Sequence, residues 1–219
     1  MTVRPILFSG PMVLALLEGR KTQTRRVIRK LKRFGDVTEF GPSDTKGYDW
    51  HFRDKDMRWN DLTFPELMRA LPCHVGDLLY VREAWYAAYG ANHVPPRDMD
   101  PDWKICPAID WNYADWGIKG RLRPGMHMPR WASRITLKVT DVRVQRLRDI
   151  SEEDAIYEGV SPRLVDCRDM GHFRGGFQGL WNTLNEKRGF GWDANPWVIA
   201  VSFEVIKANV DTVLSEVAA

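Results

Sequence analysis

The segment PILFSGPMVLALLEGRKTQTRRVI, residues 5–28, decides how the N-terminal part of the chain folds. Residues 5–8 predict a short strand. The apolar run after Ser9 predicts a helix with Ser9 as its N-cap and Gly19 at its C-terminal end, since serine caps helix starts and glycine ends helices. Residues 22–28 are typical of an extended strand. The segment therefore predicts a strand, a helix and a second strand, with a tight turn at Gly19.

The stretch after this turn is strongly basic. Eight Lys or Arg occur between Arg20 and Arg33, with no acid among them. The turn can bring Lys21 and Thr24 together, and a hydroxyl becomes a nucleophile when a base takes its proton. A lysine acts as that base when burial or neighbouring cations lower its pKa. A solvated basic face is the alternative, and the spacing favours it.

Composition indicates a soluble globular protein rather than a nucleic-acid-coating one. Hydrophobic residues make up 44% of the 219 residues, charged residues 28%, and the net charge is only +3. A chain that binds phosphates non-specifically is usually more basic overall. We expect one domain over residues 1–219, with insertions at about 31–74 and 90–129 and a flexible tail over 207–219.

The rest of the chain predicts a mixture of strands and helices. Strands are expected over 78–86, 132–147 and 195–206, and helices over 64–71, 151–159 and 177–189, the second with Ser151 as N-cap. Strands at irregular spacing with few helices do not form a βαβ array. The fold class is therefore α+β, a small mixed or antiparallel barrel decorated by helices.

Metal, disulfide and membrane patterns are not evident. The three cysteines are far apart, the five histidines are scattered, and no apolar run reaches the roughly 18 residues of a membrane span. We expect no metal, no cofactor, no membrane association and a cytoplasmic location.

Two glutamates lie in unusual places. Glu83 interrupts an apolar strand, and Arg82 points to the other face, so a distant cation or a ligand must satisfy Glu83. Glu158 lies at the C-terminal end of a short helix, where the helix dipole disfavours an acid. Glu152, Glu153 and Asp154 are ordinary first-turn acids, which the dipole favours. A functional role and a surface position remain equally open for Glu158.

Residues 127–135 combine aromatic and basic side chains. Trp131 can stack on a flat ring while Arg130 or Arg134 reaches its polar edges. A tryptophan that plugs the end of the barrel is at least as good an interpretation.

Several of these segments together resemble the ASCH-domain family, in the long form common in phages and prophages. They are PILFSGPMVLALLEGRKTQTRRVI, VGDLLYVREAW, MPRWASRITLKV, LRDISEEDAIYEGV and NPWVIAVSFEVI. The most diagnostic motif is G-x-K-x-x-T-x-R, here Gly19, Lys21, Thr24 and Arg26. The resemblance implies a PUA-like mixed β-barrel with flanking helices and two long insertions.

The resemblance also implies a function. Some members are amidohydrolases that deacylate N4-acetylcytidine and related N4-acylated cytosine compounds; others bind or cleave RNA. It implies Lys21, Thr24 and Glu158 as the catalytic residues, although Glu83 competes for the third role. The expected substrate-binding residues are Phe8, Ser9, Arg26, Glu83 and Trp131. The expected partner is a modified nucleoside, with RNA as the alternative.

Overall fold

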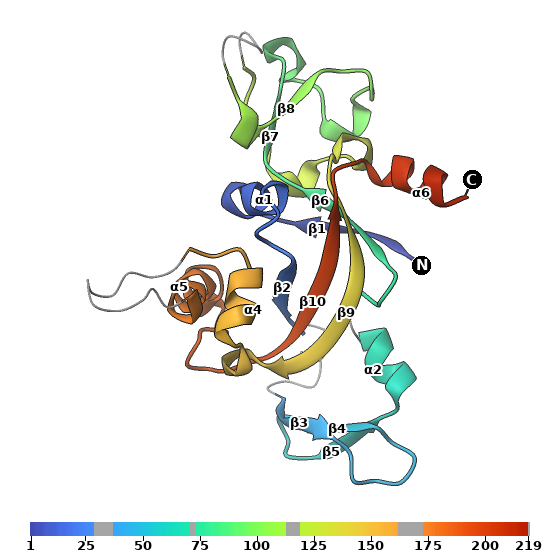
Figure 1. Cartoon of the computed structure of the whole chain (residues 1–219), viewed down its shortest axis with the longest axis vertical. Coiled ribbons are helices and arrows are strands. Elements are labelled where there is room, and N and C mark those ends of the chain that lie inside the picture. The colour runs from blue at the N-terminus through green and yellow to red at the C-terminus, as the bar shows by residue number, and fades with distance from the viewer. Residues whose placement is uncertain (29–36, 71–72, 113–118, 162–172, 219) are drawn as a thin grey trace. The chain divides into compact units, whose positions relative to one another are not determined.

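A computed structural model describes residues 1–28, 37–70, 73–112, 119–161 and 173–218 (Figure 1). The chain forms two compact units, each described by itself below. The first unit comprises Met1–Thr22, Val75–Thr140 and Phe203–Ala219, and the second comprises Gln23–His74 and Asp141–Ser202. The domain boundaries expected from the sequence stay a prediction.

The first unit is built on strands β1 and β6. Strand β1 (Val3–Leu7) runs parallel to β6 (Leu78–Arg82), and β6 pairs antiparallel with the start of β9 (Thr136–Arg146). Helix α1 (Gly10–Leu17) follows β1 and buries Val13, Ala15 and Leu16 completely. The predicted strand and helix of residues 5–19 are therefore confirmed.

The strand predicted over 78–86 is interrupted at Glu83. The chain leaves the ladder of β6 there, and a new strand, β7 (Trp85–Ala87), pairs antiparallel with β8 (Ile105–Pro107). The backbone N–H of Glu83 donates to the sulfur of Met128 rather than to a neighbouring strand. An apolar run with one acid in it thus contains a break that alternation alone does not show.

The described parts of the predicted insertion, residues 90–112 and 119–129, are largely irregular. Short 3₁₀ turns dominate the first unit here: Tyr89–Ala91 (η2), Pro96–Asp98 (η3), Ala108–Asp110 (η4), Gly125–His127 (η5) and Arg130–Ala132 (η6). They surround a small core in which Trp85 and Met128 are fully buried.

The C-terminus differs from the flexible tail expected over 207–219. Val210–Ala218 forms helix α6, and Val210 and Val213 are buried against Leu78 and Tyr80. The side-chain amide of Asn209 donates to the carbonyls of Arg130, Trp131 and Ser133. Two valines three positions apart form one apolar face of α6, and this face packs on β6. The packing stabilises a helix that is too short to be stable alone.

The second unit contains strand β2 (Gln23–Val27), which pairs antiparallel with β10 (Trp197–Ile206), Thr24 opposite Val201. Helices α4 (Glu152–Tyr157) and α5 (Phe173–Asn185) lie side by side (Figure 1). The 3₁₀ turn Leu147–Asp149 (η7) precedes α4, and the 3₁₀ turn Glu186–Arg188 (η8) follows α5. The hydroxyl of Ser151 accepts from the backbone N–H of Asp154 at 3.0 Å, which confirms the predicted N-cap.

The predicted insertion at 31–74 contains more regular structure than expected. Strands β3 (Thr38–Pro42), β4 (Trp50–Arg53) and β5 (Trp59–Leu62) form an antiparallel sheet, followed by the predicted helix, α2 (Phe64–Ala70). Phe40 and Phe52 are buried in it. These strands have four or five residues, and their described buried side chains are only Phe40 in β3 and Phe52 in β4, which is too little periodicity to predict.

The α+β class is confirmed, but a closed barrel is not formed. The main sheet has the order β1-β6-β9-β10-β2 and mixes parallel and antiparallel pairs. Among the described strands, β1 and β2 are the ends of this order, so the sheet stays open. No helix in the described ranges has the length and apolar character that crossing a membrane requires.

Candidate functional site

The turn that ends α1 positions Lys21. Gly19 adopts the left-handed conformation (φ +74°), and the backbone N–H groups of Arg20 and Lys21 both donate to the carbonyl of Ala15 at 2.9 and 3.0 Å. The Lys21 side chain is buried, with 1% of the residue exposed, and its Nζ lies 5.5 Å from the centre of the Phe8 ring. The solvated basic face is therefore wrong for Lys21.

Thr24 and Arg25 occupy consecutive positions of β2 in the second unit. Their exposed fractions are 1% and 2%. Successive side chains of a strand point to opposite faces, so Thr24 lies on the face opposite Arg25. The basic face is wrong for Arg25 as well, because its guanidinium lies among acids rather than in solvent.

Arg25 is the centre of a buried charge network. Its Nη2 donates to Asp154 at 2.7 Å and its Nη1 donates to Glu158 at 3.2 Å and to the side-chain oxygen of Gln23. The ring of Phe177 lies 5.9 Å from the guanidinium. Sequence reasoning assigned Asp154 to an ordinary first-turn role and missed this network, whose partners are more than a hundred residues apart.

Glu158 is buried at the C-terminal end of α4. Only 4% of the residue is exposed, and its backbone N–H donates to the carbonyl of Asp154 at 3.0 Å. The helix dipole disfavours a negative charge at this end, and the hydrogen bond and positive charge of Arg25 offset that effect for the Glu158 carboxylate. The surface alternative for Glu158 is therefore wrong.

Asp154 remains ionised in this network. Burial raises the pKa of its carboxyl, but the charge of Arg25, a hydrogen bond from Gln23 and the charge of Arg143 outweigh it, so the pKa lies below its ordinary value. An ionised Asp154 anchors Arg25, and Arg25 in turn fixes Glu158.

A second charge network lies in the first unit. Glu83 is 2% exposed, and Arg134 donates to both of its oxygens, from Nε at 2.9 Å and from Nη2 at 3.2 Å. Arg134 also pairs with Asp110. Burial raises the pKa of Glu83, and Arg134 offsets this only in part. The prediction that a distant cation satisfies Glu83 is confirmed.

The other predicted binding residues are placed individually. Phe8 is buried beneath Lys21, whereas Ser9 is exposed and makes no side-chain capping bond to α1. Trp131 is half-buried and packs against the core around Trp85. Arg26, in β2, is half-buried opposite Ile199. Trp131 therefore has a packing role, although the open sheet of the described strands has no barrel end for it to plug.

The predicted residues are divided between the two units. Lys21, Phe8, Ser9, Glu83 and Trp131 belong to the first, and Thr24, Arg26 and Glu158 to the second. Within the units, Lys21 contacts Phe8, and Glu158 contacts Arg25. The joint action of Lys21, Thr24 and Glu158 stays a prediction.

A metal centre is not indicated by the described side chains. Residues 29–36, which hold the last four cations of the basic segment, and 162–172, which hold Cys167, lie outside the described residues. In the remainder, no three or more His, Cys, Asp or Glu side chains gather as metal ligands would.

Comparison with known proteins gives little beyond these observations. No family model matches the chain, and no curated protein matches its sequence. Among solved structures, the high-resolution crystal structure of an ASCH domain from Lactobacillus crispatus JV V101 is similar, with a TM-score of 0.39 and 11% identity over 93% of this chain and 79% of that chain. At that TM-score the likeness decides neither fold nor function, so the ASCH resemblance rests on the sequence motifs.

Proposed function

We propose that the protein is an amidohydrolase that removes the acyl group from N4-acetylcytidine or related N4-acylated cytosine nucleosides, without a metal or cofactor. The observation that carries the proposal is the burial of the three implied catalytic residues: Lys21 and Thr24 are each 1% exposed and Glu158 is 4% exposed. Burying a lysine is costly, and polar residues that serve only solubility stay in solvent.

The chemistry assigns one role to each residue. Lys21 takes the proton of the Thr24 hydroxyl while Thr24 Oγ1 attacks the carbonyl carbon of the exocyclic amide. The tetrahedral intermediate collapses by breaking the bond to N4, and Lys21 returns the proton to the leaving amine. Water then hydrolyses the acyl-threonine ester, which yields a carboxylic acid and restores Thr24.

Burial of Lys21 supports its role as a base. Removal from water disfavours the charged form of an amine. A general base at neutral pH must be in the uncharged form, so burial favours this role. Backbone N–H groups or Arg26 would stabilise the oxyanion, a contribution worth about 3–4 kcal/mol in enzymes of this kind. Glu158 would hold and polarise Lys21 or assist the leaving group.

Arg25 is assigned a positioning role. It does not touch the reacting atoms in this mechanism, but its Nη1 donates to Glu158 and its Nη2 is anchored by Asp154. Because a guanidinium stays charged at every accessible pH, it can hold the Glu158 side chain in one place.

Cytosine recognition is proposed for the first unit. Phe8 offers a ring beneath Lys21, and the exposed Ser9 hydroxyl is not used to cap α1. The ion pair of Glu83 and Arg134 presents both an acceptor and donors, which suits the polar edge of a pyrimidine.

The test is the ultraviolet absorbance of N4-acetylcytidine during incubation with the protein. We expect conversion to cytidine by the natural chain and loss of more than about 100-fold in rate for Lys21→Ala and Thr24→Ala, as for general bases and nucleophiles. Thr22→Ala and Arg20→Ala are the matched controls, since they change a neighbouring hydroxyl and a neighbouring cation.

Several outcomes would contradict the proposal. They are retained activity in Lys21→Ala or Thr24→Ala, activity abolished by a chelator, and no conversion of N4-acetylcytidine or longer N4-acyl analogues. In the last case the same samples go into a salt-dependent RNA titration, since RNA binding is the alternative.

The described part of the basic segment does not favour RNA binding. Arg20 pairs with Glu18, and Arg25 is buried with Asp154 and Glu158. The Arg25 guanidinium is therefore not presented to phosphates, whereas that of Arg20 is exposed but already paired. A ribonuclease or RNA-binding module needs exposed cations and stacking rings, which the buried Arg25 does not provide.

A further inference from the structure

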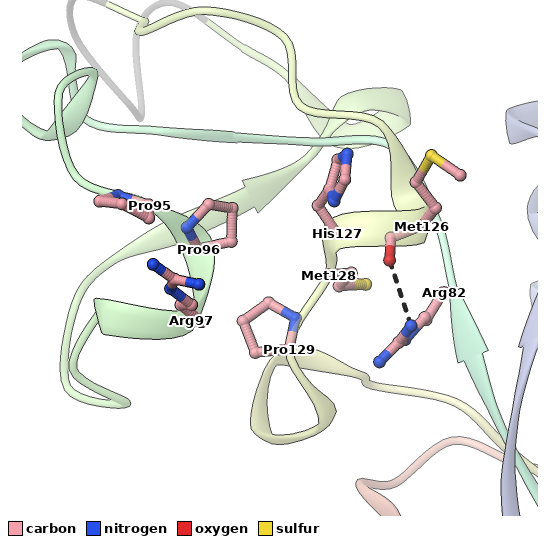
Figure 2. Close-up of a pocket in the computed structure, with 8 residues that line it drawn as sticks. All are labelled: Arg82, Pro95, Pro96, Arg97, Met126, His127, Met128 and Pro129. Carbon is pink, nitrogen blue, oxygen red and sulfur yellow. Dashed lines mark hydrogen bonds between the residues drawn. The ribbon is translucent and has the colours of Figure 1, made fainter.

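A groove of about 360 Å³ opens on the first unit (Figure 2), next to Glu83, whose backbone N–H donates to the lining residue Met128. It lies between the 3₁₀ turns η3 and η5. Its lining consists of two arginines, a histidine, three prolines and two methionines: Arg82, Pro95, Pro96, Arg97, Met126, His127, Met128 and Pro129. The volume falls within the range of small-molecule sites.

The groove carries positive charge. Figure 2 shows Arg82 and Arg97 at opposite ends, with His127 and Pro129 between them. No carboxylate is among the lining residues. Asp98, which lies outside the lining, pairs with Arg97 at 3.5 Å, and both side chains are exposed, so this pair is weak. An anion is therefore the ligand that the charges favour.

Arg82 is held in place before any ligand arrives. Its Nη1 donates to the carbonyl of Met126 and its Nη2 to the hydroxyl of Tyr80, both at 3.1 Å, and the guanidinium lies 5.3 Å from the Tyr80 ring centre. A guanidinium has five N–H donors, and these bonds use two. Each terminal nitrogen thus retains one N–H that a bound anion can take without a loss of side-chain freedom.

The walls of the groove are apolar. The rings of Pro95, Pro96 and Pro129 and the exposed side chain of Met126 supply surfaces without hydrogen-bond donors, and the buried Met128 lies behind them. Rigid proline rings and polarisable sulfur are good contacts for a planar aromatic ring. The same groove therefore offers cationic donors and flat apolar faces.

We propose that this groove binds a small organic anion that carries an aromatic ring, with a carboxylate or a phosphate ester as its anionic group. Arg82 donates to the anion, Arg97 adds a positive charge at the other end of the groove, and the prolines and Met126 cover the ring. The groove adjoins Glu83, a residue proposed to bind cytosine, but its ligand and its existence do not depend on the amidohydrolase activity.

The test is an NMR titration of the full chain with four probes. Phenyl phosphate and benzoate combine a ring with an anion; inorganic phosphate lacks the ring, and benzyl alcohol lacks the charge. We expect shifts at the backbone amides of Arg97, Met126, His127 and Met128, with the two complete probes binding at least about tenfold more tightly than the other two. The tighter of the two complete probes identifies the anionic group.

Two variants locate the site. Arg97→Gln removes a cation whose side chain is 86% exposed, so folding is not at stake, and Arg82→Gln removes the anchored guanidinium. Each should weaken binding about tenfold, as loss of a charge-assisted hydrogen bond does. Arg121→Gln, an exposed cation outside the groove, is the control and should change little.

The proposal is overturned by equal binding of benzyl alcohol and the anions, by shifts elsewhere only, or by equal weakening in Arg97→Gln and Arg121→Gln. The last result would mean general charge attraction rather than a site. Hydrolysis of N4-acetylcytidine is a separate measurement, so the two proposals fail independently.

Discussion

The two units each contain an arginine–carboxylate network, but the buried partner differs. In the second unit the Arg25 side chain is 0% exposed, and its acids Asp154 and Glu158 are 16% and 5% exposed. In the first unit the Glu83 side chain is 2% exposed, and Arg134 is 32% exposed. One network encloses a cation and the other encloses an anion.

This difference matters because the two groups respond differently to burial. A guanidinium cannot release its proton in a protein, whereas a carboxyl group can take one up. Burial raises the pKa of Glu83 even with Arg134 beside it, and the pKa of Asp154 is lowered beside Arg25. The Arg25 network thus combines a cation that keeps its charge with an Asp154 whose pKa is lowered, whereas Glu83, with its raised pKa, takes up a proton at a higher pH than an ordinary glutamate.

The largest effect is expected from Asp154→Ala. It leaves Arg25 buried with one carboxylate fewer, and breaking a buried pair costs about 3–5 kcal/mol of unfolding free energy. Urea denaturation at about pH 6 and about pH 8 should give the same cost, since Arg25 stays charged at both. The matched control is Asp141→Ala, whose partner Arg143 is 46% exposed, with an expected cost below about 1 kcal/mol. A small cost for Asp154→Ala would show that the network contributes little.

The second effect is expected from Arg134→Met and depends on pH. The raised pKa of Glu83 means that the folded state holds this proton more firmly than the unfolded state. Stability therefore falls as pH rises from the ordinary carboxyl range through the folded pKa, and loss of Arg134 deepens that fall. We expect a cost of about 2 kcal/mol at about pH 8 and less at about pH 5. Equal costs at the two pH values would refute a neutralising Glu83.

A smaller effect is expected at Gly19, in the backbone turn that positions Lys21. Gly19→Ala places a Cβ in open space but in the left-handed conformation, which costs an L-residue about 1–2 kcal/mol. Gly41→Ala is the control, because its Cβ also meets nothing and its φ is not positive. Thermal unfolding of both variants should distinguish backbone strain at position 19 from a steric effect of the added Cβ. A loss of stability in Gly41→Ala equal to that in Gly19→Ala would remove the assigned cause.

The smallest effect is expected from Arg20→Ala. Arg20 and Glu18 form an exposed pair, with side chains 49% and 44% accessible. Such pairs contribute about 0–1 kcal/mol, so urea denaturation should barely change. Together with Arg25 and Arg134, this variant completes a series from buried to exposed guanidinium. A large destabilisation here would break the link between burial and cost.

The sequence by itself determined the elements whose signals are local. The cap at Ser151, the glycine that ends α1, the apolar alternation of residues 136–146 and the apolar run of residues 197–206 each depend on neighbours within a few positions. The G-x-K-x-x-T-x-R motif likewise marked Lys21 and Thr24 without any knowledge of the fold. It did not show that they are buried.

Tertiary structure alone decided the partners of the buried charges and the short elements. Arg25 meets Glu158 across 133 positions of sequence, and Glu83 meets Arg134 across 51. The β3–β5 sheet and helix α6 are stabilised by packing on residues far along the chain rather than by their own propensity. A desolvated charge needs an opposite charge close in space, and nothing in the local sequence specifies which distant segment supplies it.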